Sequence, residues 1–414
     1  MKRKLLYTNF SKDLYILGLI EFINGLGSFV FPFLALFLTQ KLGYSATKTG
    51  YYMLLISAIY VPGSLITSHI ADKISRKKIV VLTQFCFSVS IIIAGVFVKL
   101  NPTLVPLLVI IALFFDGATD PARQALYTDH TTLENRQEAF SFFYLCMNIG
   151  FAFGPAIAGF LFNSYPSWIF IGQGIAGVLT LAIMIGVVRD KSPTKEMLQE
   201  SLKSESDDKA VNGTVLKALL SRPLLCMYIL IVSFFGFARS LSIFGLPLYV
   251  SNIFANDGPS KYGFLMSANA ILVVSCTAII VGFSKKHRSL TMISLAVFLY
   301  AISFFFMGRV TSFVILIILT ILFSIGEVFS ATNSNYFVMN HTPLGHRARF
   351  SSILTIIQGT GFAIAPFIAG IILDAHNFKT LFTTSSVLLF VCCFLILVLR
   401  KLYINKEKKD HKSI

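Results

Sequence analysis

The chain has 414 residues, of which 55% are hydrophobic and only 13% are charged, and its mean hydropathy is +0.76. Soluble proteins carry about a quarter charged residues, so this composition excludes an ordinary soluble protein. The formal net charge of +16 would suit a nucleic-acid-binding protein, but the positions of the cations along the chain argue against that class.

Apolar segments of about 20 residues, each long enough to span a bilayer, follow one another along the chain. We expect twelve transmembrane helices, near residues 13–39, 46–69, 78–98, 103–128, 138–162, 167–188, 223–252, 259–284, 289–308, 312–338, 350–373 and 379–400. The first apolar run continues to about Leu38 without a small-residue cleavage site, which indicates a retained helix rather than a signal peptide. The predicted fold class is an all-α polytopic membrane protein.

Lysine and arginine gather in one set of loops. They precede the first segment, follow the last, and lie between segments 2 and 3, 8 and 9, and 10 and 11, whereas the alternate loops hold few. The positive-inside rule then places both termini in the cytoplasm, with the protein in the cell membrane. On this interpretation the basic charge reflects topology and some attraction to anionic lipid, and no nucleic-acid partner is expected.

A polar stretch of mixed charge over residues 189–222 divides the chain. We predict a cytoplasmic linker there. It separates a six-helix bundle at 1–188 from a second at 223–402, and a cytoplasmic tail follows at 403–414. The linker therefore predicts two six-helix halves.

Two similar phrases occur in these predicted halves. "GFAFGPAIAG" begins at Gly150 and "GFAIAPFIAG" begins at Gly361, an offset of 211 residues that also aligns Asp116 with Glu327. Internal repeats are typical of secondary transporters, whose site lies between the repeats near the bilayer midplane. Glycine and proline weaken isolated helices but allow close helix contacts in membranes. We expect flexible, close-packed helices at these phrases, with static packing as the alternative, and the residues concerned are Gly150, Gly154, Pro155, Gly159, Gly361, Pro366 and Gly370.

Each ionisable residue inside an apolar segment raises the free energy of membrane insertion by about 2.5–3.5 kcal/mol, which indicates a functional or structural role. They fall only on segments 1, 4, 7 and 10, and are Glu21, Asp116, Asp120, Arg123, Arg239 and Glu327. Asp116, Asp120 and Arg123 share one helix face by their spacing. Arg123 is expected to keep Asp120 charged while Asp116 binds a proton more readily. Proton coupling is therefore assigned to Asp116, Glu327 and Asp120, and a purely structural Asp120–Arg123 ion pair is the alternative.

The same charges predict a substrate cavity. Four acids against two arginines give a net charge of −2 when all are ionised, which attracts cations. The expected cavity residues are Glu21, Asn24, Arg123, Arg239 and Glu327. Two alternatives stay open: Glu21 could pair with Arg239, or Arg239 could bind an anionic substrate group.

The turn "SHIADKISRKK" (Ser68 to Lys78) resembles the signature between helices 2 and 3 of the major facilitator superfamily. It has serine at 68 and 75, where glycine is usual. "GFAFGPAIAG" is similar to the helix 5 signature of the drug:proton antiporter branch, with Ala158 in place of a glycine and Asp116 near the place of the usual helix 4 arginine. The resemblance implies that helices 1, 4, 7 and 10 line a central cavity. It also implies that Asp72, Lys73, Arg76 and Lys77 bind neighbouring helix ends, and that these contacts break when the transporter changes conformation.

These observations predict a multidrug efflux antiporter. It would export amphipathic, cationic small molecules in exchange for protons, as a functional monomer, driven by the proton gradient without a cofactor or metal. The alternatives are export of an anionic, sugar or lipid metabolite, and a non-transporting membrane sensor or assembly protein. An enzyme is not expected, because the sequence holds no nucleophile–base motif, metal-ligand cluster or phosphate loop in a plausible place.

Overall fold

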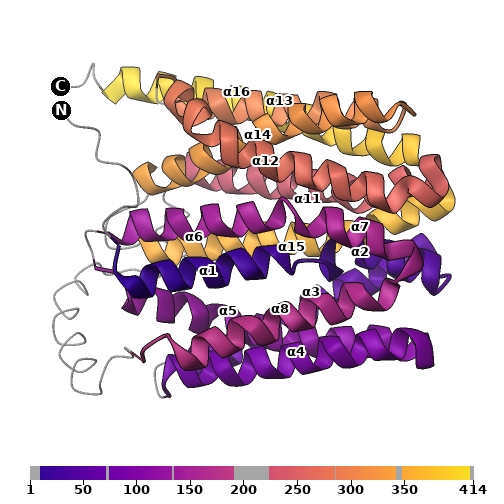
Figure 1. The fold of residues 1–414 in the computed structure, drawn as a ribbon. Coiled ribbons are helices and arrows are strands. Elements are labelled where there is room, and N and C mark those ends of the chain that lie inside the picture. Colours follow the sequence, from indigo (N-terminus) through magenta and orange to yellow (C-terminus); the bar gives the residue numbers. More distant parts are fainter. Residues whose placement is uncertain are drawn as a thin grey trace. The chain divides into compact units, whose positions relative to one another are not determined.

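The computed structural model describes residues 10–70, 74–132, 135–190, 223–284, 286–341 and 347–410. Throughout these ranges the regular structure is helical, and no strand occurs in them (Figure 1). Asp72 and Lys73, which the sequence assigns to the gating loop, lie outside the described residues.

The helices follow the predicted segments closely. In the first part of the chain they are α1 (Lys12–Leu26), α2 (Val30–Leu36), the π-helix η1 (Phe37–Lys41), α3 (Ala46–Ile70), α4 (Arg76–Leu100), η2 (Pro102–Leu104), α5 (Val105–Asp129), α6 (Arg136–Phe151), α7 (Gly154–Ser164) and α8 (Pro166–Gly186). In the second part they are α11 (Pro223–Phe254), η4 (Ala255–Asp257), α12 (Gly258–Ser284), α13 (Ser289–Met307), α14 (Phe313–His341), α15 (Arg347–Ala375) and α16 (Phe378–Asp410).

Ten helical stretches among the described residues are long and apolar enough to cross a membrane. One of them, Pro223–Thr277, contains α11 and most of α12, and α15 supplies a shorter apolar stretch at Gly359–Ala375. These lengths match bilayer-spanning helices at 1.5 Å rise per residue. The prediction of an all-α polytopic membrane protein is confirmed.

The first predicted segment is divided in the structure. The chain leaves the helix after Leu26 and re-enters it at Val30, at the sequence Gly27-Ser28-Phe29. The break exposes backbone donors, and the side-chain oxygen of Gln173 accepts hydrogen bonds from the backbone N–H groups of Phe29 (3.1 Å) and Val30 (2.8 Å). A broken helix is tolerated at membrane depth because a neighbouring helix satisfies its freed groups in this way.

The fifth predicted segment is also divided, between α6 and α7, whereas its repeat forms the single helix α15. In the first repeat Gly154 begins the new helix α7 and Pro155 lies in its first turn, where the missing N–H costs nothing. In the second repeat Ala365 precedes Pro366, which stays inside α15. Alanine favours the continuous helix more than glycine does.

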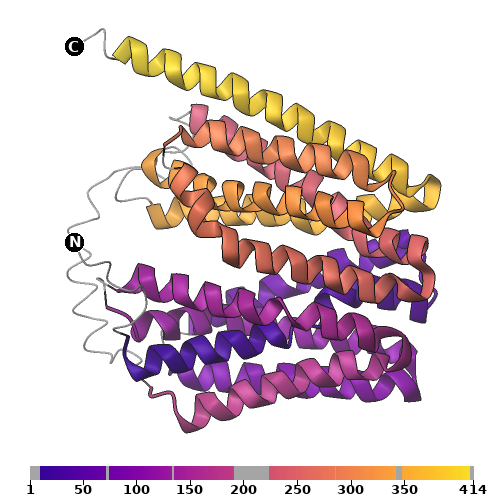
Figure 2. The same ribbon diagram turned by 45° about the horizontal axis from the view of Figure 1, so that its top comes forward.

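The chain forms two compact units. Unit 1 comprises Met1–Tyr44, Tyr52–Leu198 and Val250–Val274, and unit 2 comprises Ser45–Tyr51, Gln199–Tyr249 and Ser275–Ile414. In unit 1, α4 packs on α5 and α8, and α1 packs on α6 and α8. In unit 2, α13 packs on α14 and α16, as Figure 2 also shows. The predicted boundaries of the two halves stay a prediction.

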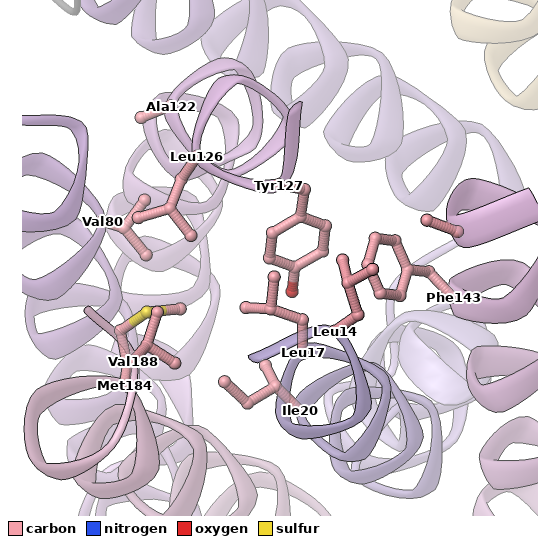
Figure 3. Close-up of a cluster of buried hydrophobic side chains, with 11 residues drawn as sticks. Leu14, Leu17, Ile20, Val80, Ala122, Leu126, Tyr127, Phe143, Met184 and Val188 are labelled. Carbon is pink, nitrogen blue, oxygen red and sulfur yellow. The ribbon is translucent and has the colours of Figure 1, made fainter. Parts of the chain in front are cut away.

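A hydrophobic cluster in unit 1 holds the helices around the site. Its buried side chains come from α1, α4, α5, α6 and the end of α8 and include Leu17, Leu126 and Phe143. Figure 3 shows Tyr127 within this cluster, its hydroxyl oxygen on the side of α1. Between membrane helices such contacts act through close van der Waals packing rather than through transfer out of water. The cluster therefore links α1, α5 and α6 through shared buried side chains.

The repeated glycine phrases lie at close backbone contacts. A Cβ atom on Gly263 of α12 would lie 2.3 Å from the carbonyl oxygen of Pro155 in unit 1, and one on Gly50 of α3 would lie 2.1 Å from that of Pro366 in unit 2. Side chains larger than hydrogen therefore do not fit at either place without a backbone shift. The predicted role of these contacts in rocking stays a prediction.

Candidate functional site

Unit 1 contains a cavity of about 240 Å³ next to the break between α1 and α2. Both charged and amide side chains line it. The lining residues are Glu21, Asn24, Gly25, Gly27, Ser28, Phe31, Gln84, Phe87, Leu113, Asp116, Arg123, Met147, Gln173, Ala176 and Gly177. A cavity with this mixture can hold the polar end of an amphipathic molecule.

Arg123 lies at the centre of the charges in unit 1. Its Nη2 atom is 2.5 Å from Oδ1 of Asp120, and its Nε atom is 3.8 Å from Oε1 of Glu21. Both acids also accept a tyrosine hydroxyl, Glu21 from Tyr127 at 2.7 Å and Asp120 from Tyr60 at 3.2 Å. Charge-assisted bonds of this kind are the strong ones, so Glu21 and Asp120 are both held in place.

Asp116 differs from the other two acids. It lines the same cavity, one helical turn before Asp120, but no hydrogen bond or salt bridge of its side chain occurs among the described residues. An intramembrane carboxyl without a protein partner is costly when ionised. Asp116 is therefore the acid in unit 1 whose oxygen atoms are available to a proton or a ligand.

Unit 2 has its own cavity of about 480 Å³, lined by Val232, Phe235, Gly236, Arg239, Glu327, Ser330, Ala331, Ser334, Gly359 and Phe362. Nη1 of Arg239 is 3.3 Å from Oε1 of Glu327 and donates to the hydroxyl oxygen of Tyr300 at 2.9 Å. The guanidinium carbon lies 5.7 Å from the Tyr300 ring centre, within cation–π range. Arg239 and Glu327 are therefore paired with each other.

The predicted charges thus gather in two places. Glu21, Asn24, Asp116 and Arg123 line the cavity of unit 1, and Arg239 and Glu327 line that of unit 2. Asp120 is held beside the first cavity through Arg123. Of the alternatives for Glu21 and Arg239, the structure gives each residue a partner within its own unit: Arg123 for Glu21, and Glu327 for Arg239.

The two described cations of the predicted gating loop hold helix ends in unit 1. Arg76 forms an ion pair with Asp129 at the end of α5. The Nζ atom of Lys77 donates to the carbonyl oxygens of Ile185 (3.1 Å) and Val188 (2.6 Å) at the end of α8. Cations at helix C-termini are favourable because the last carbonyls have no partner within the helix and carry partial negative charge.

Apart from Asn24, sequence reasoning missed the uncharged glutamine and tyrosine side chains of the site. Gln84 and Gln173 line the first cavity, and Tyr60, Tyr127 and Tyr300 hydrogen-bond to the charged groups. A search limited to ionisable residues passes over them. The two glutamines carried a usable signal, because an amide inside an apolar segment also needs a partner. The tyrosines carried none, because an aromatic residue in a membrane helix is ordinary.

Apolar helices of spanning length around cavities with buried charges define a polytopic membrane transporter. The sequence matches the Major Facilitator Superfamily over residues 17–359 and 237–413. The chain belongs to this superfamily, and it is a transporter and not an enzyme.

Several proteins of Bacillus subtilis (strain 168) are similar in sequence. The MFS-type transporter YqjV is 26% identical over 351 residues, which cover 83% of this chain and 82% of YqjV. Multidrug resistance protein 1 is 23% identical over 363 residues, covering 83% of this chain and 86% of that protein.

Solved structures share the fold. The nucleoside transporter NupG has a TM-score of 0.74 at 14% identity, with 94% of this chain and 98% of NupG covered. A bacterial homologue of the human lysosomal transporter Spinster has a TM-score of 0.71, also at 14% identity, with 94% of this chain and 96% of that chain covered. At these identities the likeness concerns the fold.

Proposed function

We propose that the protein is a proton-coupled exporter of amphipathic cations in the cell membrane, with both termini in the cytoplasm. A cation and a proton would compete for Asp116 in the cavity of unit 1. Loading from the cytoplasmic side would displace the proton, and a proton from outside would later displace the cation. Exchange of one proton for one monovalent cation moves no net charge, so the pH gradient drives it; a second proton per cycle would add about 2.3 kcal/mol per 100 mV of membrane potential.

The observation that carries the proposal is the unequal pairing of the intramembrane charges. Both arginines lie against acids, Arg123 against Asp120 and Arg239 against Glu327. Asp116 lines the cavity with no side-chain hydrogen bond or salt bridge in the described ranges. A carboxylate that forms no direct ion pair favours a cationic ligand or a proton, and both cannot bind it at once.

Two further facts support the proposal. The pairing of Arg239 with Glu327 weakens the alternative of an anionic substrate, because Glu327 already balances that charge. The similarity to multidrug resistance protein 1 of Bacillus subtilis supports drug export as the proposed activity. Glu327 is proposed as a second proton carrier, since protonation would free it from Arg239.

The test uses purified protein in liposomes that contain a pH-sensitive dye. Proton movement is recorded after addition of a lipophilic cation to the parent, Asp116→Asn and Glu327→Gln. We expect cation-dependent proton flux in the parent and at least a tenfold loss in Asp116→Asn, which keeps the size of the side chain. Proton flux that persists unchanged in Asp116→Asn would contradict the role of Asp116. An absence of flux with any cation, in folded protein, would contradict cation export.

A further inference from the structure

Gln173 on α8 has an amide group whose orientation is fixed by its partners. Its Oε1 atom lies 3.1 Å from the backbone nitrogen of Phe29 and 2.8 Å from that of Val30. Both backbone groups can only donate, so the side chain must present its oxygen to them and cannot be flipped. The Nε2 atom, with its two hydrogen-bond donors, therefore lies on the other side of the amide.

The contact that fixes Gln173 is rigid. A Cβ atom on Gly27 would lie 2.4 Å from Cβ of Ala176, and one on Gly172 would lie 2.7 Å from the ring of Phe29. The broken part of the first helix is thus pressed against α8 on both sides of the hydrogen bonds. Little freedom remains for the amide to turn away, so its donors are preorganised.

The donors of Gln173 have no protein acceptor among the described residues, and Gln173 lines the same cavity as Asp116. Polar groups in enclosed sites find a partner, in solvent or in a ligand. A ligand that replaces the solvent without offering an acceptor leaves those donors unsatisfied, which lowers its affinity.

We propose that Gln173 makes the cavity selective for cations that carry a hydrogen-bond acceptor, such as a carbonyl or ether oxygen, on the body next to the charge. The cationic centre binds at Asp116 and the acceptor binds the amide of Gln173. This inference rests on the proposed function and narrows its range of substrates. A cation with a purely hydrocarbon body pairs with Asp116 but leaves the donors of Gln173 without an acceptor.

The test compares three probes with equal charge: 1-benzylpyridinium, its 3-acetyl derivative and its 3-isopropyl derivative. The acetyl and isopropyl groups have similar shapes, but the acetyl group alone has an acceptor oxygen. Binding to the purified full-length protein in detergent is measured by titration calorimetry. We expect the acetyl probe to bind the parent about fivefold more tightly than the isopropyl probe, the effect of one hydrogen bond. This comparison needs no variant.

The variant Gln173→Glu keeps oxygen atoms for the Phe29 and Val30 N–H groups but removes both donors. Its added negative charge acts on all three probes alike, so the ratio of the two affinities is the readout. We expect the ratio to fall from about five to one or below. In Asp116→Asn both probes should weaken together and the ratio should remain.

Three results would overturn the inference. Equal affinities of the acetyl and isopropyl probes for the parent, with binding that still depends on Asp116, would refute the acceptor preference and leave cation recognition intact. An unchanged ratio in folded Gln173→Glu would remove Gln173 from recognition. Failure of the folded parent to bind any of the probes would contradict both this inference and the proposed cation site.

Discussion

Two buried tyrosine hydroxyls form hydrogen bonds of opposite direction with the charged groups. Tyr127 is 4% exposed and donates to the carboxylate of Glu21, whereas Tyr300 is 1% exposed and accepts from the guanidinium of Arg239. A phenol can do either, because it is both donor and acceptor. In unit 1 the hydroxyl adds a partner to an acid that is already near Arg123, and it keeps Glu21 turned toward α5.

Replacing Tyr127 by phenylalanine should destabilise the protein by about 1–3 kcal/mol, since Glu21 loses a buried donor and nothing larger is introduced. The measurement is thermal unfolding in detergent. Tyr165→Phe serves as control, because Tyr165 is 58% exposed and its loss of a hydroxyl should cost less than about 0.5 kcal/mol. Equal melting temperatures of Tyr127→Phe and the parent would show that the hydroxyl contributes nothing to holding Glu21.

At the scale of single residues, hydropathy alone identified the charged groups because a charge inside an apolar segment is conspicuous. The pairing of Asp120 with Arg123 followed from their spacing on one helix, and the structure has that contact. The contacts of Glu21 with Arg123 and of Arg239 with Glu327 join different helices. Helix periodicity says nothing about which faces meet, so these partners needed the structure.

At the scale of helices, α3 is capped by a side chain from another helix. Asp374, near the end of α15, accepts hydrogen bonds from the backbone N–H groups of Ala46 (3.0 Å) and Thr47 (2.8 Å), all within unit 2. The first N–H groups of a helix have no partner in their own helix, and a carboxylate there also interacts favourably with the helix dipole. Asp374 therefore fastens the first turn of α3 to α15.

Asp374→Ala should loosen that first turn. An N-cap contributes about 1 kcal/mol, so amide hydrogen exchange of a peptide covering residues 46–51 should become about fivefold faster. Hydrogen-exchange mass spectrometry of the detergent-solubilised protein measures this. Asp257→Ala is the control, since Asp257 is exposed and is paired with Lys261 rather than with α3. Unaltered exchange at residues 46–51 would refute the cap.

Two glycines of α12, one at a close helix contact and one away from it, allow a controlled test of that contact. Gly263 faces the backbone of Pro155, whereas, apart from the local helix backbone, no heavy atom of the described residues lies within 4 Å of a Cβ on Gly282. Gly263→Ala should destabilise the protein by about 1–3 kcal/mol through overpacking. Gly282→Ala should leave stability unchanged or raise it by up to about 1 kcal/mol, because alanine favours helix. Thermal unfolding of both variants measures these differences. A Gly263→Ala variant as stable as the parent would show that α7 and α12 can move apart without loss of stability.

The sequence predicted the helical segments well and their interruptions poorly. Apolar length reports whether a segment can cross the bilayer, and it was sufficient for α4, α8 and α13. The break after Leu26 depends on Gln173, which lies far away in the sequence and supplies the acceptor for the freed N–H groups. Local composition cannot reveal whether such a partner exists, and for that reason the first segment was expected to be continuous.

At the scale of the whole molecule, the six predicted intramembrane charges are divided unequally. Glu21, Asp116 and Asp120 accompany one arginine in unit 1, whereas Glu327 accompanies one arginine in unit 2. The negative excess therefore belongs to unit 1, where Asp116 lines the cavity. The predicted halves already divide the charges in this way, whereas the pairing of Glu21 with Arg123 and of Arg239 with Glu327 depends on which helices face each other.

The central claim is that a cation and a proton compete for Asp116, and release of protons on binding tests it most directly. Purified protein in weakly buffered detergent solution, held near pH 6.5, is mixed with 3-acetyl-1-benzylpyridinium while a pH electrode records the protons released. We expect up to one proton per protein from the parent and none from folded Asp116→Asn, because an amide has no group that ionises in this pH range. Cation binding to the parent without proton release at any pH between 5 and 8, or equal release from both proteins, would contradict the account.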